Sequence, residues 1–316
     1  MSVLLEKKTE PQMQMQSRLW PGFHLLMAYA CSIVLLTALL AGKLASIRFP
    51  NPLGLTIGIA FASGVVFTLA IFWHERGKMD LRDAVMTIPW GLFLAATLPL
   101  LVLAAARADM PLQDSNLARF DGLLGISVPE IVSWSSSHWL GGLVNRTYTL
   151  LSPLLVISAL LPALTGKVKN AQMFVLANVM AFAIGLPLFA LLPAIGPWYG
   201  YHVAATPHQL DCQSAILLFR APNHQLTHLD AIICFPSFHV IWAIFCAAAL
   251  SGSRFLRVPA ALLSGMIVVS TVTTGWHYFV DVLGGIAVAG LSLAIANAYL
   301  RRLGPFCQRS EPVVQR

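Results

Sequence analysis

The stretch that decides the fold is Phe235-Pro236-Ser237-Phe238-His239, together with Thr274-Gly275-Trp276-His277-Tyr278-Phe279-Val280-Asp281 further along the chain. Each piece places a histidine at the end of an apolar segment. His277 and Asp281 are four residues apart, and on a helix this spacing stacks two side chains on one face, one turn from each other. A carboxylate within reach of one imidazole nitrogen fixes the tautomer of the ring and leaves the other nitrogen as a base or nucleophile. The pattern predicts a paired histidine and aspartate close to a second histidine.

The first piece also predicts a site for an anion. Pro236 comes shortly before His239, and proline is typical of the first turn of a helix. The backbone N–H groups at such a start, with the hydroxyl of Ser237, can bind a phosphate, although Ser237 can equally be a plain helix cap. Ser270 lies two turns before His277 on the same face, and a serine there either binds the phosphate or only packs against a neighbouring helix.

The composition excludes a soluble globular protein. The chain has 316 residues, of which 57% are hydrophobic and 10% are charged, whereas an average soluble domain carries about 25% charged residues. Many apolar runs approach the roughly 20 residues that a helix needs to cross a bilayer. The class predicted is all-α, a polytopic transmembrane helical bundle. Eight spans are expected, near 23–42, 52–73, 85–106, 149–165, 171–193, 238–252, 257–276 and 279–300.

The distribution of Lys and Arg predicts the orientation in the membrane. The net charge is +7, but the basic residues stand mostly at the ends of apolar runs, which is typical of membrane topology and argues against nucleic acid as a partner. With a cytoplasmic N-terminus, 14 of the 20 Lys and Arg residues fall on the cytoplasmic side and 6 on the other. We therefore expect both termini inside and His239, His277 and Asp281 at the outer face. The first apolar run, near Phe23, lacks a clear cleavage site and is interpreted as a retained span.

Two long segments on the outer side complete the predicted architecture. Residues 107–148 mix apolar residues with Trp and Ser, which indicates short helices lying in the membrane interface. Residues 194–236 are rich in aromatic residues and histidines, and a loop of this length is usually functional or disordered. We expect an ordered lid over the site.

The motifs resemble those of the type 2 phosphatidic acid phosphatase superfamily. Pro236-Ser237-Phe238-His239 matches its Pro-Ser-x-His motif, and the run from Ser270 through His277 to Asp281 matches Ser-Arg-x5-His-x3-Asp except that Thr271 replaces the arginine. A third motif, Lys-x6-Arg-Pro, is missing from the sequence. Three features are similar to the inositolphosphotransferase-type branch, which includes the inositol phosphorylceramide synthases. They are the Phe-Pro-Ser-Phe-His sequence, the missing arginine and the upstream run Leu192-Pro193-Ala194-Ile195-Gly196-Pro197. The resemblance is strong over residues 192–285, weak over 119–148 and absent over the first hundred.

The resemblance implies a fold and a set of catalytic roles. His277 would be the nucleophile that forms a phosphohistidine, with Asp281 orienting it, and His239 would be the general acid and then the general base. No metal or other cofactor is implied. The expected division is a cytoplasmic N-terminal segment, N-terminal transmembrane helices, a phosphatase-like or phosphotransferase-like core with six core helices, and a C-terminal tail. These cover residues 1–22, 23–106, 107–303 and 304–316 respectively.

The missing arginine requires a replacement, because a phosphoryl group that gains negative charge needs a fixed positive charge. Arg220 is the only Lys or Arg between residue 194 and the Pro-Ser-x-His piece, and it is predicted to bind the phosphate. Arg119 and Arg146 are the other candidates on the outer side.

Several polar residues of the outer segments leave alternatives open. His224, His228 and Asp230 have a spacing that suits metal ligands on a helix, although the alternative of solvated loop histidines is favoured. A disulfide between Cys212 and Cys234 is possible. Three further residues either bind a polar acceptor molecule or have a structural role. They are Asp121, Asn145 and Tyr148.

The function expected is that of an integral-membrane lipid phosphatase or phosphotransferase, with the inositolphosphotransferase type favoured. Its partners would be a lipid phosphate and either water or an alcohol acceptor, in a bacterial inner membrane. A transporter is one alternative, but the ionisable residues cluster at one face rather than at mid-depth. A catalytically inactive relative is the other, because Thr271 replaces the arginine.

Overall fold

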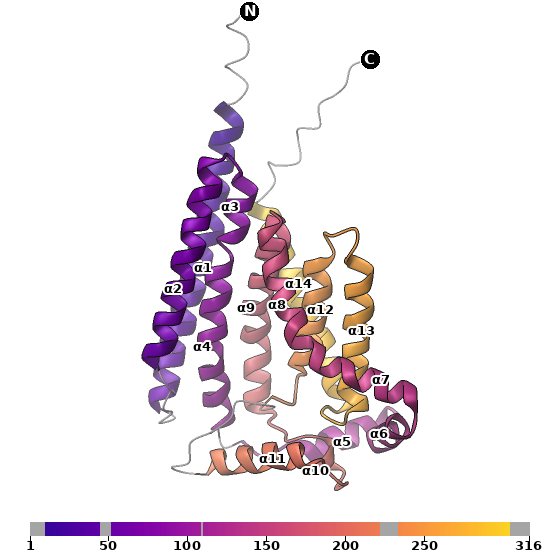
Figure 1. Ribbon diagram of the computed structural model, residues 1–316. Helices are drawn as coiled ribbons and strands as arrows, with labels where there is room; N and C mark the ends of the chain where they lie inside the picture. The colour runs from indigo at the N-terminus through magenta and orange to yellow at the C-terminus, as the bar shows by residue number, and fades with distance from the viewer. Residues whose placement is uncertain (1–9, 45–51, 109, 222–232, 304–316) are drawn as a thin grey trace, which may run out of the picture.

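The computed structural model describes residues 10–44, 52–108, 110–221 and 233–303, and these residues form an all-helical bundle (Figure 1). Each of the eight predicted spans corresponds to one helix. The eight are α1 (Glu10–Leu44), α2 (Pro52–Glu75), α4 (Ile88–Ala106), α8 (Leu151–Leu164), α9 (Val168–Leu191), α12 (Phe238–Leu250), α13 (Arg257–Thr273) and α14 (Phe279–Leu303). The predicted class, an all-α polytopic membrane bundle, is confirmed.

Six of the helical stretches in the described residues are long and apolar enough to cross a membrane. One of the six joins α3 (Met79–Val85) to α4, and another joins α7 (Trp139–Thr147) to α8. The remaining two predicted spans, α12 and α13, are shorter apolar helices. His239 lies in the first turn of α12, and α13 ends four residues before His277.

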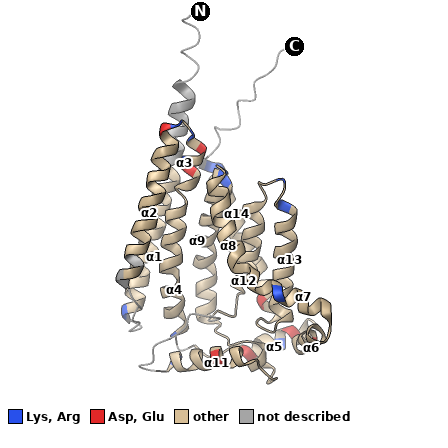
Figure 2. Cartoon of the chain, in the orientation of Figure 1, with Lys and Arg blue, Asp and Glu red and all other residues tan. Residues whose placement is uncertain are grey.

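The two ends of the bundle differ in charge (Figure 2). The start of α1 and the end of α14 lie at the upper end in Figure 1, and Lys and Arg residues gather there. Five short helices lie across the lower end instead, where short helices were predicted for residues 107–148 and a lid for residues 194–236. They are α5 (Asp114–Leu123), α6 (Val128–Ser137), α7, α10 (Pro197–Gly200) and α11 (Pro207–Arg220).

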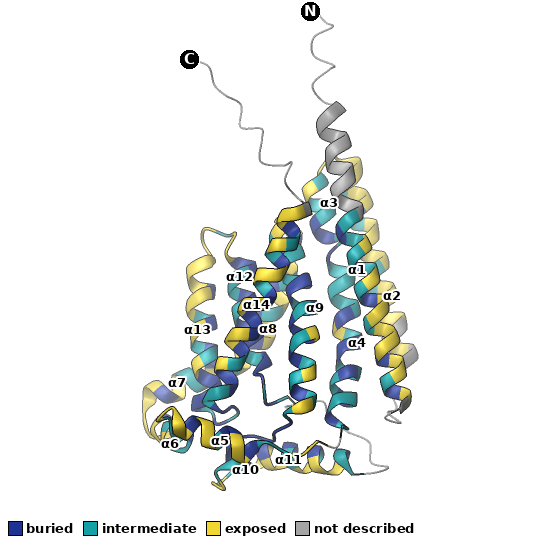
Figure 3. Cartoon of the chain, turned by 180° about the vertical axis from the view of Figure 1, so that it is seen from behind, coloured by how far each residue is buried: buried dark blue, intermediate teal, exposed yellow. Residues whose placement is uncertain are grey.

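The hydrophobic core lies between α1, α4, α9, α12 and α14. Phe23, Leu98, Leu176, Ile241 and Ala289 are buried together there, one from each helix. The outward faces are apolar as well but exposed (Figure 3), which in a membrane is the lipid-facing surface. The bundle therefore holds the ends of α12 and α14 in fixed positions relative to each other.

Candidate active site

The two histidine segments meet where α12 and α14 begin, at the lower end of the bundle. The N–H of Ser237 donates to the carbonyl of Asp281 at 3.1 Å, which ties the two helix starts together. Ser237 caps α12, since its hydroxyl accepts from the N–H of Val240 at 3.4 Å. His239 lies in the first turn of α12, and its ring centroid is 6.0 Å from that of His277. The structure thus brings together the two histidines predicted to act on one phosphate.

The tautomer of His277 follows from its contacts. Its Nδ1 is 3.1 Å from the carbonyl oxygen of Cys234 and 3.4 Å from Oδ2 of Asp281. A carbonyl oxygen only accepts hydrogen bonds, so Nδ1 carries the proton and Nε2 keeps its lone pair. The nearer partner is the carbonyl of Cys234, which the sequence did not indicate; Asp281 shares the proton from a longer distance.

Burial keeps His277 neutral. The residue is 4% exposed, and burial lowers its pKa from 6.5 to about 4, against a smaller opposing effect of the Cys234 carbonyl. A neutral imidazole with a free Nε2 lone pair is the form that acts as a nucleophile.

Asp281 organises the turn that carries His277. Its Oδ2 accepts the N–H of Tyr278 at 2.9 Å and the thiol of Cys234 at 3.1 Å, in addition to facing His277. The side chain is fully buried. The carboxylate therefore holds the backbone on both sides of the site as well as the imidazole.

Glycines allow the chain to pass through this crowded region. Gly275 ends α13 with φ +74, a left-handed conformation that glycine adopts without strain. A Cβ on Gly285 would lie 2.7 Å from the carbonyl oxygen of Ser237, so only glycine lets α14 approach the Pro-Ser-x-His segment this closely.

Two carboxylates on α5, those of Asp114 and Asp121, accept hydrogen bonds next to the turn that carries His277. Asp121 accepts the N–H groups of Phe279 and Val280 at 2.9 and 2.8 Å and so caps the start of α14. Asp114 accepts the N–H groups of Ile195 and Gly196 near 3.0 Å. Of the two alternatives left open for Asp121, binding of a polar acceptor or a structural role, these contacts favour the structural role.

Asp114 was not predicted from the sequence, and it is buried with 2% exposure. It also receives the phenol O–H of Tyr278 at 3.0 Å, across 164 positions in the chain. Burial raises the pKa of the carboxyls of Asp114 and Asp121, while their hydrogen bonds oppose that shift. No local motif surrounds Asp114, so sequence reasoning had no signal with which to find it.

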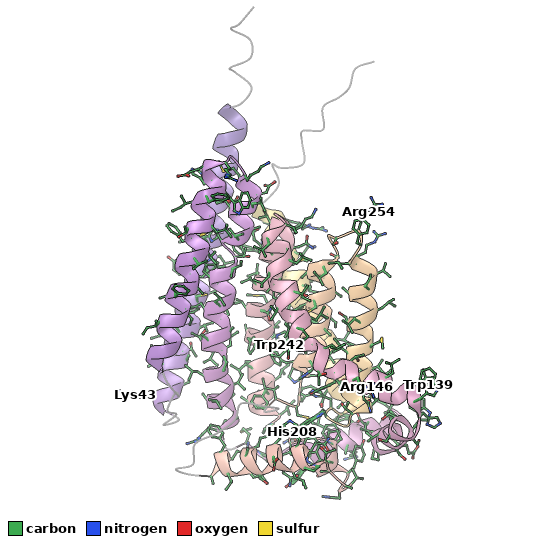
Figure 4. The ribbon with its side chains drawn as sticks, in the orientation of Figure 1. Lys43, Trp139, Arg146, His208, Trp242 and Arg254 are labelled. Carbon is green, nitrogen blue, oxygen red and sulfur yellow. The ribbon has the colours of Figure 1, made fainter. Side chains whose placement is uncertain are left out.

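Aromatic rings line the approach to His239. Tyr148 stacks on His239 with the ring centroids 4.3 Å apart and the planes 12° from parallel. Trp276 lies next to Tyr148, and both Trp198 and His208 meet Trp276 edge-on at 5.3 Å. Figure 4 labels His208 on α11, at the lower end of the molecule. Trp198 and His208 come from the segment predicted as a lid, and they contact the rings beside His239 through Trp276.

The remaining motif residues are occupied by helix contacts. The hydroxyl of Ser270 donates to the carbonyl of Ile267 at 2.7 Å, within its own helix. Thr271, at the position of the superfamily arginine, donates to the carbonyl of Val268, and its own carbonyl accepts the N–H of His277 at 3.1 Å. Both residues are buried, and their hydroxyl protons are used inside α13 rather than at the histidines.

The structure does not bring Arg220 to the histidines. Its guanidinium donates to the carbonyls of Ala108 and Met110, at the end of α11 far from His208. Twelve residues of helix separate the two, a rise of about 18 Å. The phosphate-binding role predicted for Arg220 does not fit this position, because α11 runs along the lower face and carries its C-terminal end away from Trp276 and the histidines.

The other polar residues predicted as candidates on the outer side lie in different surroundings. Arg146 is exposed at the end of α7 (Figure 4). Asn145 accepts the hydroxyl of Thr273 at 2.6 Å and donates weakly to Ser135, which joins α7 to the end of α13. The residues His224, His228 and Asp230 lie outside the described residues.

The four cysteines among the described residues form no disulfide with one another. Cys212 and Cys234 are both buried, and the disulfide between them that the sequence left open does not form. Ligand atoms of Cys234, His277 and Asp281 lie within 4.8 Å of one another, the one such group in the part of the chain that the structure describes. Burial raises the pKa of the Cys234 thiol well above its usual value, and the S–H donates to Asp281, so this group is better described as a hydrogen-bonded network than as a metal centre.

A family model of the PAP2 superfamily matches residues 115–295, which is more than half of the chain. The chain belongs to the PAP2 superfamily. Comparison with curated proteins and with solved structures finds no match. The matched region runs from α5 into α14 and contains His239, His277 and Asp281, whereas α1 to α4 lie before it. Family and apolar helices together support a membrane enzyme of the lipid phosphatase type.

Proposed function

We propose that this chain is a membrane phosphotransferase of the inositolphosphotransferase type, which works through a phosphohistidine on His277. The observation that carries the proposal is the state of His277: a buried neutral imidazole with Nδ1 bonded to the Cys234 carbonyl and Nε2 left as the reactive atom. His239 lies beside it on a separate helix. One histidine can therefore attack while the other transfers the proton.

In the first step, the Nε2 lone pair of His277 attacks the phosphorus of a lipid phosphate ester. The N–P bond forms as the bond from phosphorus to the leaving oxygen breaks, and His239 gives its proton to that oxygen. Asp281 and the Cys234 carbonyl stabilise the positive charge that develops on the His277 ring.

In the second step, His239 takes the proton of the acceptor hydroxyl. The acceptor oxygen bonds to phosphorus, the N–P bond breaks, and the electron pair returns to Nε2 of His277. With water as acceptor the product is free phosphate or a phosphate monoester; with an alcohol the phosphoryl headgroup moves to a new molecule.

The start of α12 supplies the phosphate cradle in this proposal. Among the described residues, the N–H groups of Phe238 and His239 have no acceptor, while Val240 and Ile241 donate to Ser237. Free N–H groups at a helix start favour an anion, and in a buried site they stabilise the charge of the transition state.

The charge of this cradle favours a phosphodiester. Among the described residues, no Lys or Arg side chain bonds to His239, His277 or Asp281, and residues 222–232 contain neither Lys nor Arg. A phosphate monoester carries about −1.5 to −2 charges at pH 7, whereas a diester carries one. A site with neutral donors binds the diester at lower electrostatic cost, so the missing arginine supports a headgroup transferase.

The location proposed is a bacterial inner membrane. The Lys and Arg residues at the upper end indicate the cytoplasmic side, which leaves the histidines at the outer face with both termini inside.

The test uses the full chain in detergent with phosphatidylinositol labelled in its phosphate, with and without a lipid alcohol as acceptor. We expect label on the acceptor, lost in His277→Ala and kept in His138→Ala, an exposed histidine of the same face. Release of free phosphate or of a labelled monoester alone would instead assign a hydrolase, with water as the acceptor. No turnover of this lipid or of phosphatidic acid would assign an inactive relative.

A further inference from the structure

A cleft at the upper end of the bundle lies at the opposite end from the histidines. It has a volume of about 420 Å³ and is formed by the start of α9 and the ends of α12 and α14. Its size falls within the range of ligand pockets, about 300–1,000 Å³. Nothing in the proposed phosphotransfer uses it.

The rim of the cleft is basic. Lys169 and Arg301 line it from opposite helices, both exposed. None of the described residues that line the cleft is acidic. Lys169 also lies in the first turn of α9, where the helix dipole adds a partial positive charge. The rim therefore has the electrostatic character of a phosphate site.

The wall of the cleft changes from basic to apolar along each helix. On α14, Arg301, Asn297 and Leu293 follow one another at intervals of four residues and so share one face. On α9, Met173 follows Lys169 by the same interval. A ligand in this cleft would meet cations at the membrane surface and hydrocarbon one or two turns further in.

A side-chain contact joins α9 to the end of α12 at one edge of the cleft. The amide of Asn170 donates to the carbonyls of Ala248 and Ala249 at 3.2 and 3.0 Å. These bonds satisfy the end of α12, whose carbonyls would otherwise repel an anion. Asn170 thus holds the backbone at this edge of the cleft. The two cations, Lys169 and Arg301, remain to face the ligand.

We propose that this cleft binds the phosphate headgroup of an anionic phospholipid of the cytoplasmic leaflet. The order of lining residues, cations outside and apolar side chains inside, matches the order of groups along a phospholipid molecule. Basic pockets between transmembrane helices on the cytoplasmic side bind such headgroups. The site is separate from the catalytic one and does not depend on the proposed reaction.

The experiment measures lipid binding by native mass spectrometry of the full chain in detergent, titrated with phosphatidylglycerol. The double variant Lys169→Gln/Arg301→Gln should lose affinity by roughly thirtyfold, since each basic residue near an anionic headgroup contributes about fivefold. Ala294→Trp, which fills the cleft from an exposed position without changing charge, should weaken binding by at least about tenfold.

The matched control is Arg254→Gln/Arg257→Gln, which removes the same charge at the same end outside the cleft. It should change the affinity by less than about threefold. Equal losses in the control and in Lys169→Gln/Arg301→Gln would overturn the proposal in favour of general surface attraction. Equal binding of phosphatidylcholine would overturn the headgroup assignment. Displacement of phosphatidylglycerol by equimolar inorganic phosphate would assign the cleft to a free anion instead. Retained catalytic turnover in each variant verifies the fold.

Discussion

The two ends of the bundle use charged residues in opposite ways. At the lower end, Asp114, Asp121 and Asp281 are buried, and each accepts backbone N–H groups. At the upper end, charged side chains such as Arg254 and Arg257 are exposed. The buried carboxylates of the lower end hold backbone N–H groups beside the histidines, whereas we propose that the exposed cations of the upper end orient the chain in the membrane. Substitutions at the lower end should therefore change the site itself.

The largest effect is expected from Asp114→Ala. This change leaves the N–H groups of Ile195 and Gly196 buried without their acceptor, at about 1–3 kcal/mol for each unpaired group. The O–H of Tyr278 keeps the carbonyl of Gly196 as its acceptor at 2.8 Å. We expect the free energy of unfolding to fall by about 3 kcal/mol or more, measured by denaturation in detergent. Turnover should fall with it, because Tyr278 adjoins His277.

The control for Asp114 is Glu130→Ala, an exposed carboxylate on the neighbouring α6. It should change stability by no more than about 0.5 kcal/mol. If both variants behave alike, Asp114 does not support the site.

A smaller effect is expected from Gly285→Ala. The added methyl group would lie 2.7 Å from the Ser237 carbonyl, so the start of α12 must shift, at a cost of about 1–3 kcal/mol. Turnover should fall by more than the stability change alone explains, since His239 moves with Ser237. Gly290→Ala, on the same helix with open space around it, should be neutral or stabilising; a similar loss there would contradict the close-approach argument.

The pH dependence of kcat/KM tests the burial of His277 at the lower end. The pKa of His277 is lowered from 6.5 to about 4, so its neutral form persists into the acid range. We expect the acid limb of kcat/KM to lie below pH 6.5, with activity largely kept at pH 5.5. An acid limb at or above pH 6.5 would mean that His277 is not the buried neutral nucleophile described here.

The same shift affects stability. The unfolded chain protonates this histidine below pH 6.5, while the folded chain does so only near pH 4, so the unfolded state binds more protons between the two values. Stability should therefore fall on acidification from pH 6.5 towards pH 4. His277→Ala should show a weaker fall over this window.

The smallest effect is expected at the upper end. Arg254→Gln/Arg257→Gln alters exposed cations next to α13, and the free energy of unfolding should change by no more than about 0.5 kcal/mol for each. Denaturation in detergent with unchanged turnover is the expected result. A loss as large as that of Asp114→Ala would remove the distinction between the two ends.

Sequence reasoning found those features whose signals are local. Apolar runs predicted the eight helices, and the spacing of His277 and Asp281 predicted their contact. The expectation that both stand on one helix was wrong for His277, which lies in the bend before α14. It missed partners that are distant in the chain: Asp114 beneath Tyr278, and the Cys234 carbonyl that sets the His277 tautomer. A backbone carbonyl has no residue signature, and a lone aspartate in an interfacial helix looks like any surface residue.

The prediction for Arg220 shows the same limit. The missing arginine led us to expect a replacement cation, and Arg220 is the only Lys or Arg in the predicted loop before the Pro-Ser-x-His piece. Its position at the far end of α11 depends on the direction of that helix across the lower face. Composition and spacing do not specify that direction.

The measurement that tests the central claim most directly is the chemical identity of the phosphorylated intermediate. The full chain is mixed with phosphatidylinositol labelled in its phosphate, quenched during turnover and digested under alkaline conditions, in which phosphohistidine survives. We expect label on Nε2 of His277, because Nδ1 is occupied by its proton and the Cys234 carbonyl. Label on Nδ1 of His277, on His239, or on no histidine while turnover proceeds would contradict this expectation.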